Sequence, residues 1–404
     1  MPGRYIGPHK VKQTKNLVAS GFLAKSEVFF ATRKGHKFTM RIAQVAPLYE
    51  SVPPKKYGGT ERVVSWLTEE LVRLGHDVTL FASGDSMTTA RLVSVCENAL
   101  RLDPKCTDQL AHHMLMLEHV FSEKDNFDLI HFHIDYLHFP LSRRENLVQV
   151  STLHGRLDIR GLAPLYSVYR DMPVISISDA QRDPLSWANW QGTVHHGMPK
   201  DQYSLCNTTG DYLAFLGRIS PEKGVPQAIE IAKRSGLPLK VAAKIDKADA
   251  EYYQTVIKPL LKDPIVEFVG EIGYPEKNDF LGNAAALLFP IQWPEPFGIV
   301  MIEAMACGTP VVAYPYGSVP EVIEDGITGF IVPDVEGAVQ ALKSIETFDR
   351  GMCRWRFEQR FTDKRMTKDY LAIYQHVLKG KPAPIELSDG VLSWTKLALP
   401  SSTT

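Results

Sequence analysis

Short apolar runs alternate with helical stretches along most of the chain, and this alternation limits the fold more than any other feature. In its first instance, MRIAQVA (40–46) predicts a buried strand, 60–75 predicts an amphipathic helix, and HDVTLFAS (76–83) predicts a second strand. The glycine pair Gly58–Gly59 precedes the helix, and Thr60 is its candidate N-cap. A strand, a helix and a strand in this order form a βαβ unit, which requires a parallel sheet covered by helices.

The same alternation runs through two series of elements, with TVHHGMPKDQY (193–203) between them as a predicted linker. The chain is therefore predicted to be an α/β protein with two Rossmann-like βαβ domains that face each other across a cleft. Ligands of such sheets bind at the carboxyl ends of the strands, so the cleft is the expected site. Further strands are expected within 127–133, 147–155, 172–178, 212–220, 239–244, 265–270, 286–291, 309–314 and 329–334, and further helices within 107–123, 225–236, 248–261 and 299–308.

The composition excludes several classes of protein. The 404 residues are enough for two or three domains of roughly 150 residues each, and 44% hydrophobic with 23% charged residues is typical of globular chains. A net charge of −1 argues against a whole-protein nucleic-acid binder. No apolar run approaches the roughly 20 residues that span a bilayer. The five scattered cysteines include no C-x-x-C pair, which favours a reducing, cytoplasmic compartment over a disulfide framework or a cysteine zinc site.

The two ends of the chain differ from its middle. Residues 1–39 hold eight Lys or Arg side chains and one acid, a net charge of +7. This basic head is interpreted as a disordered arm or as sequence upstream of a start at Met40, and less readily as an organelle transit segment. The predicted organisation is a basic extension that we expect to be disordered (1–39), an N-terminal Rossmann-like domain (40–196), a linker (197–211), a C-terminal Rossmann-like domain (212–362), a helix that packs back on the N-terminal domain (363–378) and a tail (379–404).

The segment FPIQWPEPFGIVMIEAMACGTPVVAY (289–314) carries the strongest chemical signal. Pro294 and Pro296 predict a rigid loop after a strand, and Gly298 then opens a helix. The first amides of that helix lack intrahelical acceptors and lie at the positive end of its dipole, which is a typical phosphate site. Glu295 and Glu303 flank this helix start. Two acids beside a phosphate need other partners, and the hydroxyl groups of a sugar or a ribose are natural ones.

A second segment, FLGRISPEKG (215–224), places two cations at the end of a strand. Arg218 and Lys223 stand five residues apart in a glycine-containing loop, and two such cations suit a diphosphate. The alternative is a surface loop with solvated charges, which is less consistent with an anion-binding helix in the same domain.

GGTERVV, TLHG, FLGRISPEKG, EPFGIVMIE and AMACGTPVV together resemble the retaining family 4 glycosyltransferases of GT-B fold, over residues 40–378. The resemblance implies that Arg218 and Lys223 bind the donor diphosphate, that Glu295 holds hydroxyls of the transferred sugar, and that Glu303 binds the ribose. It also implies that a glycine loop closes over the phosphates, that a strand-end histidine faces the donor sugar, and that the start of one helix lies under sugar and phosphate. The glycine loop is Gly58 and Gly59, and the strand-end histidine is His154. The helix start comprises Phe297, Gly298, Ile299 and Val300.

The resemblance implies a retaining transfer of a hexose from a nucleotide-diphosphate sugar to an acceptor hydroxyl. A UDP-sugar is favoured, with GDP- and ADP-sugars left open, and the base is expected near Val269–Ile272. No cofactor or metal is expected, because cations and a helix end can neutralise the diphosphate. The alternatives are another GT-B sugar-nucleotide enzyme, such as an epimerase or a phosphorylase, and a sugar-nucleotide binder without catalysis.

The acceptor is open among a small molecule, a glycan and a lipid, with peripheral membrane contact also open, because this family recognises acceptors through its variable first domain. The strings APLYESVPPKKYGGTERVV and HFHIDYLHFPLSRR resemble uncharacterised bacterial members, some linked to glucosylation of a pterin. The linker motif VHHGMP departs from the Asn-Gly pair of many members. His131 and His133 alternate onto one face of a predicted strand, and we interpret them as packing or cleft-lining residues rather than metal ligands.

Overall fold

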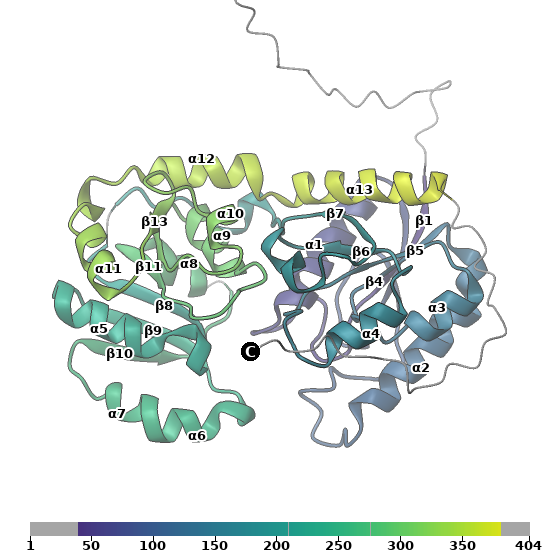
Figure 1. The fold of residues 1–404 in the computed structure, drawn as a ribbon, viewed down its shortest axis with the longest axis horizontal. Helices are drawn as coiled ribbons and strands as arrows, with labels where there is room; N and C mark the ends of the chain where they lie inside the picture. The colour runs from purple at the N-terminus through teal and green to yellow at the C-terminus, as the bar shows by residue number, and fades with distance from the viewer. Residues whose placement is uncertain (1–38, 209, 275, 381–404) are drawn as a thin grey trace, which may run out of the picture. The chain divides into compact units, whose positions relative to one another are not determined.

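The structure is a computed structural model that describes residues 39–208, 210–274 and 276–380 (Figure 1). The predictions made for the basic extension 1–39 and for the tail 379–404 therefore lie almost wholly outside the described residues. Within the described part, the strands form two separate sheets, and every strand pair in both sheets is parallel. This confirms the predicted α/β class with two parallel sheets.

The first sheet is built from residues 41–193, and its strands lie in the order β3-β2-β1-β4-β5-β6-β7. Its central strands β1 and β4 are almost entirely buried, as expected for strands that helices cover on both faces. The strands are β1 (Arg41–Val45), β2 (Asp77–Phe81), β3 (Arg91–Val93), β4 (Leu129–Phe132), β5 (Gln149–Thr152), β6 (Val174–Ser176) and β7 (Trp190–Thr193), and the helices are α1 (Gly59–Arg73), α2 (Gln109–Ser122), α3 (Phe139–Glu145) and α4 (Leu162–Val168).

The second sheet is built from residues 213–331, in the order β10-β9-β8-β11-β12-β13. The strands are β8 (Leu213–Arg218), β9 (Leu239–Lys244), β10 (Val266–Gly270), β11 (Ala286–Phe289), β12 (Val311–Ala313) and β13 (Gly329–Ile331). The helices are α5 (Val225–Ser235), α6 (Ala250–Tyr252), α7 (Lys258–Leu260), α8 (Glu276–Gly282), α9 (Ile299–Ala306), α10 (Val319–Val322), α11 (Val335–Leu342), α12 (Arg350–Arg360) and α13 (Asp363–Lys379), with one π-turn (Tyr253–Ile257) joining α6 to α7.

Both sheets reverse their strand order at one place. In the first sheet the order runs outward in one direction from β1 and in the other direction from β4, and β8 and β11 play the same parts in the second sheet. Such a switch point leaves a crevice beyond the carboxyl ends of the two central strands, because their following connections leave on opposite faces. The topology therefore fixes where a ligand can bind before any side chain is considered.

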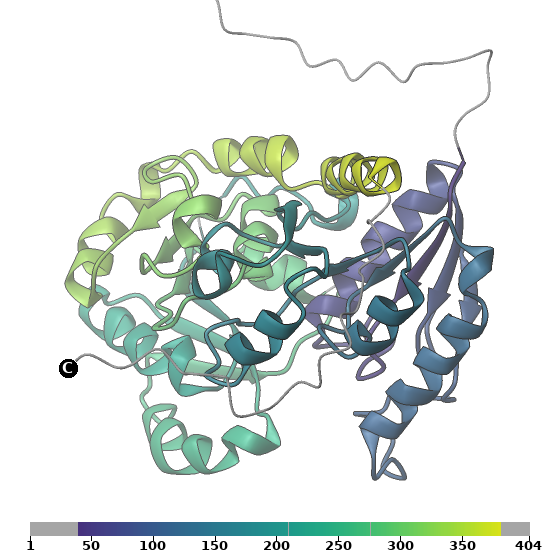
Figure 2. The ribbon, with the colours of Figure 1, turned by 45° about the vertical axis from the view of Figure 1, so that its right-hand side comes forward.

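The C-terminal helix α13 returns to the first sheet. It packs against α1 and β5, as Figures 1 and 2 show, and it buries Tyr370 and Tyr374. The approach to this helix runs beside the linker, since the amide of Met198 donates to the carbonyl of Phe361 at 3.0 Å and the amide of Asp363 donates to the carbonyl of Met198 at 3.0 Å. The two connections between the sheets thus pair with each other.

The sequence reading was wrong or incomplete in three respects. The helices α3, α4, α8, α10, α11 and α12 were not predicted. Thr60 does not cap α1, because the helix begins at Gly59 and Gly58 occupies the cap position without a capping side chain. The short strands β3 and β7 were not predicted. Both lie at the edges of the first sheet and neither contains a fully buried residue, so neither has the apolar run that marks a central strand.

Arg350 joins the far end of α9 to its surroundings. This buried side chain donates to the carbonyls of Cys206 (2.8 Å), Ala284 (2.9 Å) and Gly282 (2.7 Å), and to the hydroxyl of Thr309 (2.7 Å). The guanidinium thereby connects the linker, the end of α8 and the turn that follows α9. Removing it would leave several buried acceptors without donors.

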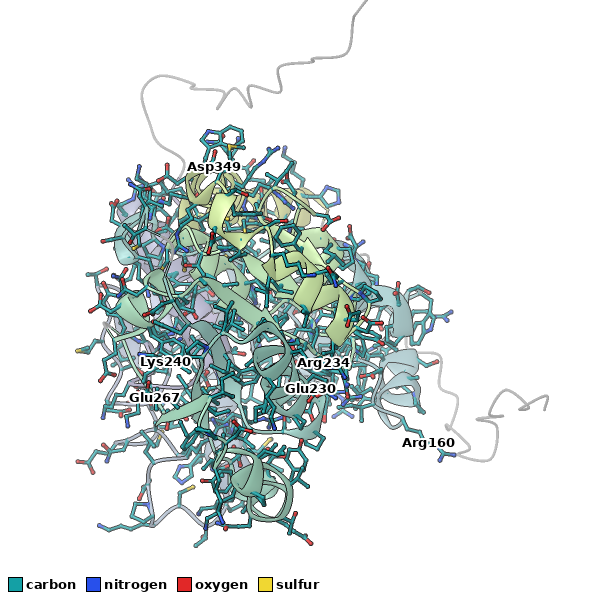
Figure 3. All side chains as sticks on the ribbon, turned by 90° about the vertical axis from the view of Figure 1, so that its left-hand side faces the viewer. Arg160, Glu230, Arg234, Lys240, Glu267 and Asp349 are labelled. Atoms are coloured by element: carbon teal, nitrogen blue, oxygen red, sulfur yellow. The ribbon has the colours of Figure 1, made fainter. Side chains whose placement is uncertain are left out.

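We expect Arg350→Met to lower the free energy of unfolding by about 3 kcal/mol or more, since each buried group left unsatisfied costs about 1–3 kcal/mol. The measurement is a urea titration followed by tryptophan fluorescence. The matched control is Arg234→Met on α5, where an exposed arginine pairs with Glu230 at 2.6 Å (Figure 3). The control should change the free energy by less than about 0.5 kcal/mol, and equal shifts for the two variants would contradict the role given to Arg350.

Candidate functional site

A cavity of about 610 Å³ lies beyond the carboxyl ends of the strands and is lined by residues from both sheets. The loops that follow β1, β4, β5 and β6 contribute from the first sheet, and the end of β9 and the loops that follow β8, β10 and β11 contribute from the second. Every site residue predicted from the sequence lines this one cavity: Gly58, Gly59, His154, Arg218, Lys223, Glu295, Phe297, Gly298, Ile299, Val300 and Glu303.

The start of α9 presents free backbone amides to the cavity. Gly298 occupies the cap position with φ of 74°, and no side chain caps the helix. A Cβ atom at this position would lie 2.9 Å from the Cε atom of Met301 and 3.0 Å from a ring carbon of Phe289, so only glycine fits here without a shift. The first amides of the helix therefore remain available to an anion at the positive end of the helix dipole.

Arg218 and Lys223 provide the positive charges of the cavity wall beside this helix. Lys223 ends the short turn that follows β8, and its Nζ atom lies 2.5 Å from an Oε atom of Glu295 and 5.0 Å from the ring centre of Trp293. Arg218 donates to Glu222 at 2.9 Å, and its buried Nε atom lies 3.6 Å from Oδ2 of Asp249. Lys223 keeps N–H donors beyond its pair with Glu295, and the rest of the Arg218 guanidinium is partly exposed at the cavity.

The loop that carries Glu295 is fixed by its neighbours. The amide of Ser318 donates to the carbonyl of Glu295 at 3.0 Å, and the hydroxyl of Ser318 donates to the carbonyl of Phe297 at 2.8 Å. The ring of Phe297 is buried and packs on His196, with 4.7 Å between ring centres, and on Phe361 at 6.1 Å. Phe297 therefore holds the loop against the linker, and the carboxylate of Glu295 stays at the cavity next to Lys223.

Glu303 is buried in the second turn of α9 and is held as a carboxylate by two donors. Lys277 lies 3.0 Å from one oxygen and 3.2 Å from the other, and the hydroxyl of Tyr203 donates at 2.9 Å. Burial alone would raise the pKa of Glu303, but the charges of Lys277 and Arg62 and the two hydrogen bonds lower it overall. The group is an ionised acceptor that already has strong partners.

His154 stands at the end of β5 and is half-buried in the cavity wall. Its Nε2 atom lies 2.9 Å from Nδ1 of His133, and its ring stacks on that of His196 with 5.4 Å between centres. Burial lowers the pKa of His154 to about 3, so the imidazole is neutral at physiological pH. His154 can exchange hydrogen bonds with a ligand but does not supply a positive charge.

The glycine pair that precedes α1 meets the start of α9. A Cβ atom added to Gly59 would lie 3.5 Å from Cδ1 of Ile299, so the two helix starts face the cavity from its two sides. Gly58 has φ of 152°, and a Cβ atom there would lie 2.7 Å from Cβ of Pro54. Two helix N-termini, each with a glycine at the N-cap position and no capping side chain, therefore lie at the same cavity.

Sequence reasoning missed several residues of the site. Lys277 and Tyr203 are the partners of Glu303, and Trp293 receives both Lys223 and Arg156 over its ring. Lys277 lies at the start of α8, after β10, and its contact with Glu303 on α9 joins two separate helices, so no local pattern indicates it. In this structure Glu295 pairs with Lys223, and Glu303 pairs with Lys277 and with the hydroxyl of Tyr203.

Other residues named from the sequence lie as follows. His133 and His196 line the cavity, whereas His195 pairs with Glu321 at 3.0 Å. Ile272, from the loop expected to contact a base, also lines the cavity. His131 and His133 do share one face, with ring centres 4.0 Å apart.

The described residues contain no cluster of three or more His, Cys, Asp or Glu side chains that could hold a metal ion. Within the same part of the chain, no helix combines the length and apolar character needed to cross a membrane.

Comparison with known proteins gives two family matches. The family described as "Glycosyl transferases group 1" matches residues 200–351, and "Glycosyltransferase Family 4" matches residues 57–186. Among curated relatives, the "Uncharacterized glycosyltransferase MJ1178" of Methanocaldococcus jannaschii is 26% identical over 52% of this chain, which spans 62% of that relative. The "O-antigen chain mannosyltransferase C" of Escherichia coli is 24% identical over 84% of this chain and all of the relative.

Solved structures share the fold. AviGT4, described as a glycosyltransferase involved in avilamycin A biosynthesis, superimposes with a TM-score of 0.67 at 22% identity, over 84% of this chain and 98% of its own. The Anabaena protein Alr3699/HepE in complex with UDP and glucose superimposes with a TM-score of 0.66 at 16% identity, over 83% of this chain and all of its own.

The buried carboxyl group of Glu61, which lines the cavity, makes the free energy of unfolding depend on pH. It lies in the first turn of α1 at 5% exposure, and burial raises its pKa from 4.5 to about 7. Between pH 4.5 and 7 the folded protein keeps this proton while the unfolded chain loses it, so this group makes stability fall as the pH rises through that window. Above about pH 7 the carboxyl group is ionised in both states, and the loss of stability no longer grows.

We therefore expect Glu61→Gln to raise the melting temperature relative to the unsubstituted protein more at pH 8 than at pH 4.5. The measurement is thermal unfolding of both proteins at the two pH values. Glu118→Gln, at an exposed position on α2, is the control and should give the same difference at both. A Glu61→Gln difference that does not change with pH would refute the raised pKa.

Proposed function

Since this chain belongs to the family 4 glycosyltransferases of GT-B fold, we propose that it is a retaining hexosyltransferase. It moves a hexose from a nucleotide-diphosphate sugar to an acceptor hydroxyl, keeps the anomeric configuration, and needs no metal ion or other cofactor. The observation that carries the proposal is the meeting of the uncapped start of α9 with the Lys223–Glu295 pair in one cavity. The start of α9 is suited to a phosphate, and the Lys223–Glu295 pair is suited to a phosphate that lies beside a sugar.

The leaving group explains the charges of this wall. When the bond between the sugar C1 and the diphosphate oxygen breaks, negative charge grows on the diphosphate. Arg218, Lys223 and the amides that begin α9 are preorganised donors for that charge, and such electrostatic stabilisation is usually the largest catalytic contribution. Lys223 is paired with Glu295 at 2.5 Å in this structure, and a bound diphosphate would share the ammonium group with the carboxylate.

Retention is proposed to arise by front-face attack. The acceptor oxygen forms its bond to C1 on the side from which the diphosphate leaves, and the acceptor proton passes to a phosphate oxygen of the leaving group. His154 faces the cavity as a neutral imidazole, which suits hydrogen bonding to a sugar hydroxyl better than attack on C1. Glu303, held by Lys277 and Tyr203, is proposed to accept from the ribose.

A UDP-sugar is the favoured donor. The complex of Alr3699/HepE with UDP and glucose supports this choice by fold similarity, and the name of the E. coli mannosyltransferase supports a hexose. The acceptor class stays open among small molecules such as a pterin, glycans and lipids. The five free cysteines agree with a reducing compartment, and the proposal places the reaction in the cytoplasm.

The experiment that tests the proposal is a screen of UDP-, GDP- and ADP-hexoses with the full chain, in the presence of excess EDTA. We expect slow hydrolysis of one donor without an acceptor, and an anomeric product of the donor's own configuration by NMR. A non-catalytic binder would be stabilised thermally by a donor that stays intact, and an epimerase would change the sugar while it remains attached to the nucleotide. Turnover that EDTA abolishes would refute metal independence.

We expect Lys223→Ala to lower kcat by about two or more powers of ten, since loss of one preorganised oxyanion donor costs about 100- to 1,000-fold. The control is Lys233→Ala on α5, a lysine that pairs with Asp263 on the surface at 2.7 Å, and it should leave kcat unchanged. Near-normal turnover of Lys223→Ala at saturating donor would remove the lysine from the mechanism.

Glu295→Gln and Glu303→Gln should impair the enzyme in different ways. Glu295 is assigned to the reacting sugar, whose hydroxyls become better donors as positive charge grows on the ring, so its substitution should lower kcat. Glu303 is assigned to the ribose, which does not change during transfer, so its substitution should mainly raise the KM for the donor. The measurement is a donor titration of each variant at saturating acceptor.

Each of these substitutions also leaves a lysine without its carboxylate, so melting temperatures must first be compared to exclude a loss of folded protein. The reverse result, with kcat lost in Glu303→Gln and only KM changed in Glu295→Gln, would mean that the two assignments are exchanged.

A further inference from the structure

Polar side chains connect His154 to the C-terminal helix through the interior of the first sheet. Nε2 of His154 lies 2.9 Å from Nδ1 of His133, and Nε2 of His133 lies 2.8 Å from Oε1 of Gln44. The amide nitrogen of Gln44 then donates to the hydroxyl of Tyr374 on α13 at 3.2 Å. Gln44 and Tyr374 are 330 residues apart in the chain, so this connection exists only because α13 returns to the first sheet.

The connection continues beyond Tyr374. Its hydroxyl lies 2.6 Å from Nδ1 of His131, and Nε2 of His131 lies 2.7 Å from the hydroxyl of Thr152. Thr152 donates to the hydroxyl of Tyr370, also on α13, at 3.2 Å. We call these seven side chains the polar row: His154, His133, Gln44, Tyr374, His131, Thr152 and Tyr370.

The polar row is buried and uncharged. Its six members other than His154 are at most 2% exposed, and burial lowers the pKa of His131 and of His133 well below the usual value. Each of these rings therefore carries one proton, on one nitrogen, and offers a lone pair on the other. Because every histidine must donate on one side and accept on the other, the hydrogen bonds of the row must all run in the same direction.

The contacts of Gln44 select one of the two directions, and His154 agrees with it. The Oε1 atom of Gln44 can only accept, so Nε2 of His133 donates to it and Nδ1 of His133 accepts from His154. The Nδ1 atom of His154 is shielded from solvent and has no partner among the described residues. If the row donated toward His154, Nδ1 would carry a buried N–H without an acceptor, which is the rarer and costlier of the two defects. The favoured direction therefore has His154 donating from Nε2 to His133, His133 donating to Gln44, and Tyr374 donating to His131.

We propose that Tyr374 is a positioning residue of the active site, which acts through Gln44 and His133 to hold His154 as the Nε2–H tautomer. Nδ1 then keeps its lone pair, and His154 lines the cavity as a neutral ring of one fixed tautomer. The kinetic part of this inference rests on the proposed function. The tautomer itself is a property of the protein without ligand and does not depend on that function.

The row is more than a set of isolated contacts. Hydrogen bonds that run head to tail polarise one another, and a break in the middle weakens the bonds on both sides. Tyr374 is the central member, because it accepts from Gln44 and donates to His131. Tyr370 is the last member and accepts from Thr152 alone, so loss of its hydroxyl leaves the bonds between His154 and Tyr374 in place.

The first test is the tautomer of His154 in the full chain, read from long-range ¹H–¹⁵N NMR spectra with ¹⁵N-labelled histidine. The signals of His154 are assigned by their absence in His154→Gln. We expect a protonated Nε2 and a bare Nδ1. The opposite tautomer would overturn the proposal, whether or not the protein transfers a sugar.

The second test compares Tyr374→Phe with Tyr370→Phe, two like substitutions one turn apart on α13. Tyr374→Phe should mix the His154 tautomers and lower kcat about two- to tenfold, the effect of one net hydrogen bond, with the donor KM unchanged. Tyr370→Phe should keep the Nε2–H tautomer and a near-normal kcat. Equal behaviour of the two variants in both readouts would show that the hydroxyl of Tyr374 is structural only.

If Tyr374→Phe does not fold, Gln44→Met breaks the same connection from the strand side and is expected to give the same change in tautomer and kcat. An unchanged His154 tautomer in Gln44→Met would overturn the proposal. If no donor is turned over by the unsubstituted protein, the proposed function fails, and the tautomer measurements still decide whether Tyr374 controls His154.

Discussion

The parallel direction of the strands is the constraint on which the rest of the structure depends. Because all strands of a sheet end on the same edge, the loops after β1, β4 and β5 collect on one side of the cavity and those after β8, β10 and β11 on the other. Residues as far apart as Gly59 and Ile299 thereby become neighbours. The starts of α1 and α9 lie at the same cavity, so the fold supplies anion-binding amides before any cationic side chain is added.

The charged side chains of the cavity wall form pairs of opposite charge. Two acids near a phosphate site would repel the ligand, yet Glu295 is paired with Lys223 and Glu303 with Lys277. The charge of Lys277 helps to lower the pKa of Glu303 despite its burial, so this carboxylate stays ionised as a hydrogen-bond acceptor. The same lysines remain able to share their charge with a diphosphate. The wall can therefore hold hydroxyl groups and phosphate groups side by side, which is the requirement that a sugar nucleotide imposes.

The sequence was sufficient to predict the parallel α/β class, most strands, several of the helices, and a set of residues that do line one cavity. These features depend on local patterns, such as the apolar run of β11 or the Gly298 helix start. What could not be predicted depends on contacts between distant segments. Lys277 on α8 contacts Glu303 on α9, and Tyr203 contacts the same carboxylate from the linker. The edge strands β3 and β7 lack the apolar run of a central strand. Local patterns also gave the wrong cap for α1, where glycine conformation outweighs the propensity of Thr60.

The polar row shows why the C-terminal helix is more than a cover for the first sheet. Apolar residues at Gln44, His131 and Thr152 would pack the same interior without the desolvation cost of buried polar groups, and such replacements are often neutral or stabilising. An apolar interior cannot determine which ring nitrogen of a neutral histidine carries the proton. The row begins at a cavity residue and reaches α13 through side chains that are each satisfied on both sides. The return of α13 to the first sheet thus connects a cavity-lining histidine to the C-terminal helix as well as covering the core.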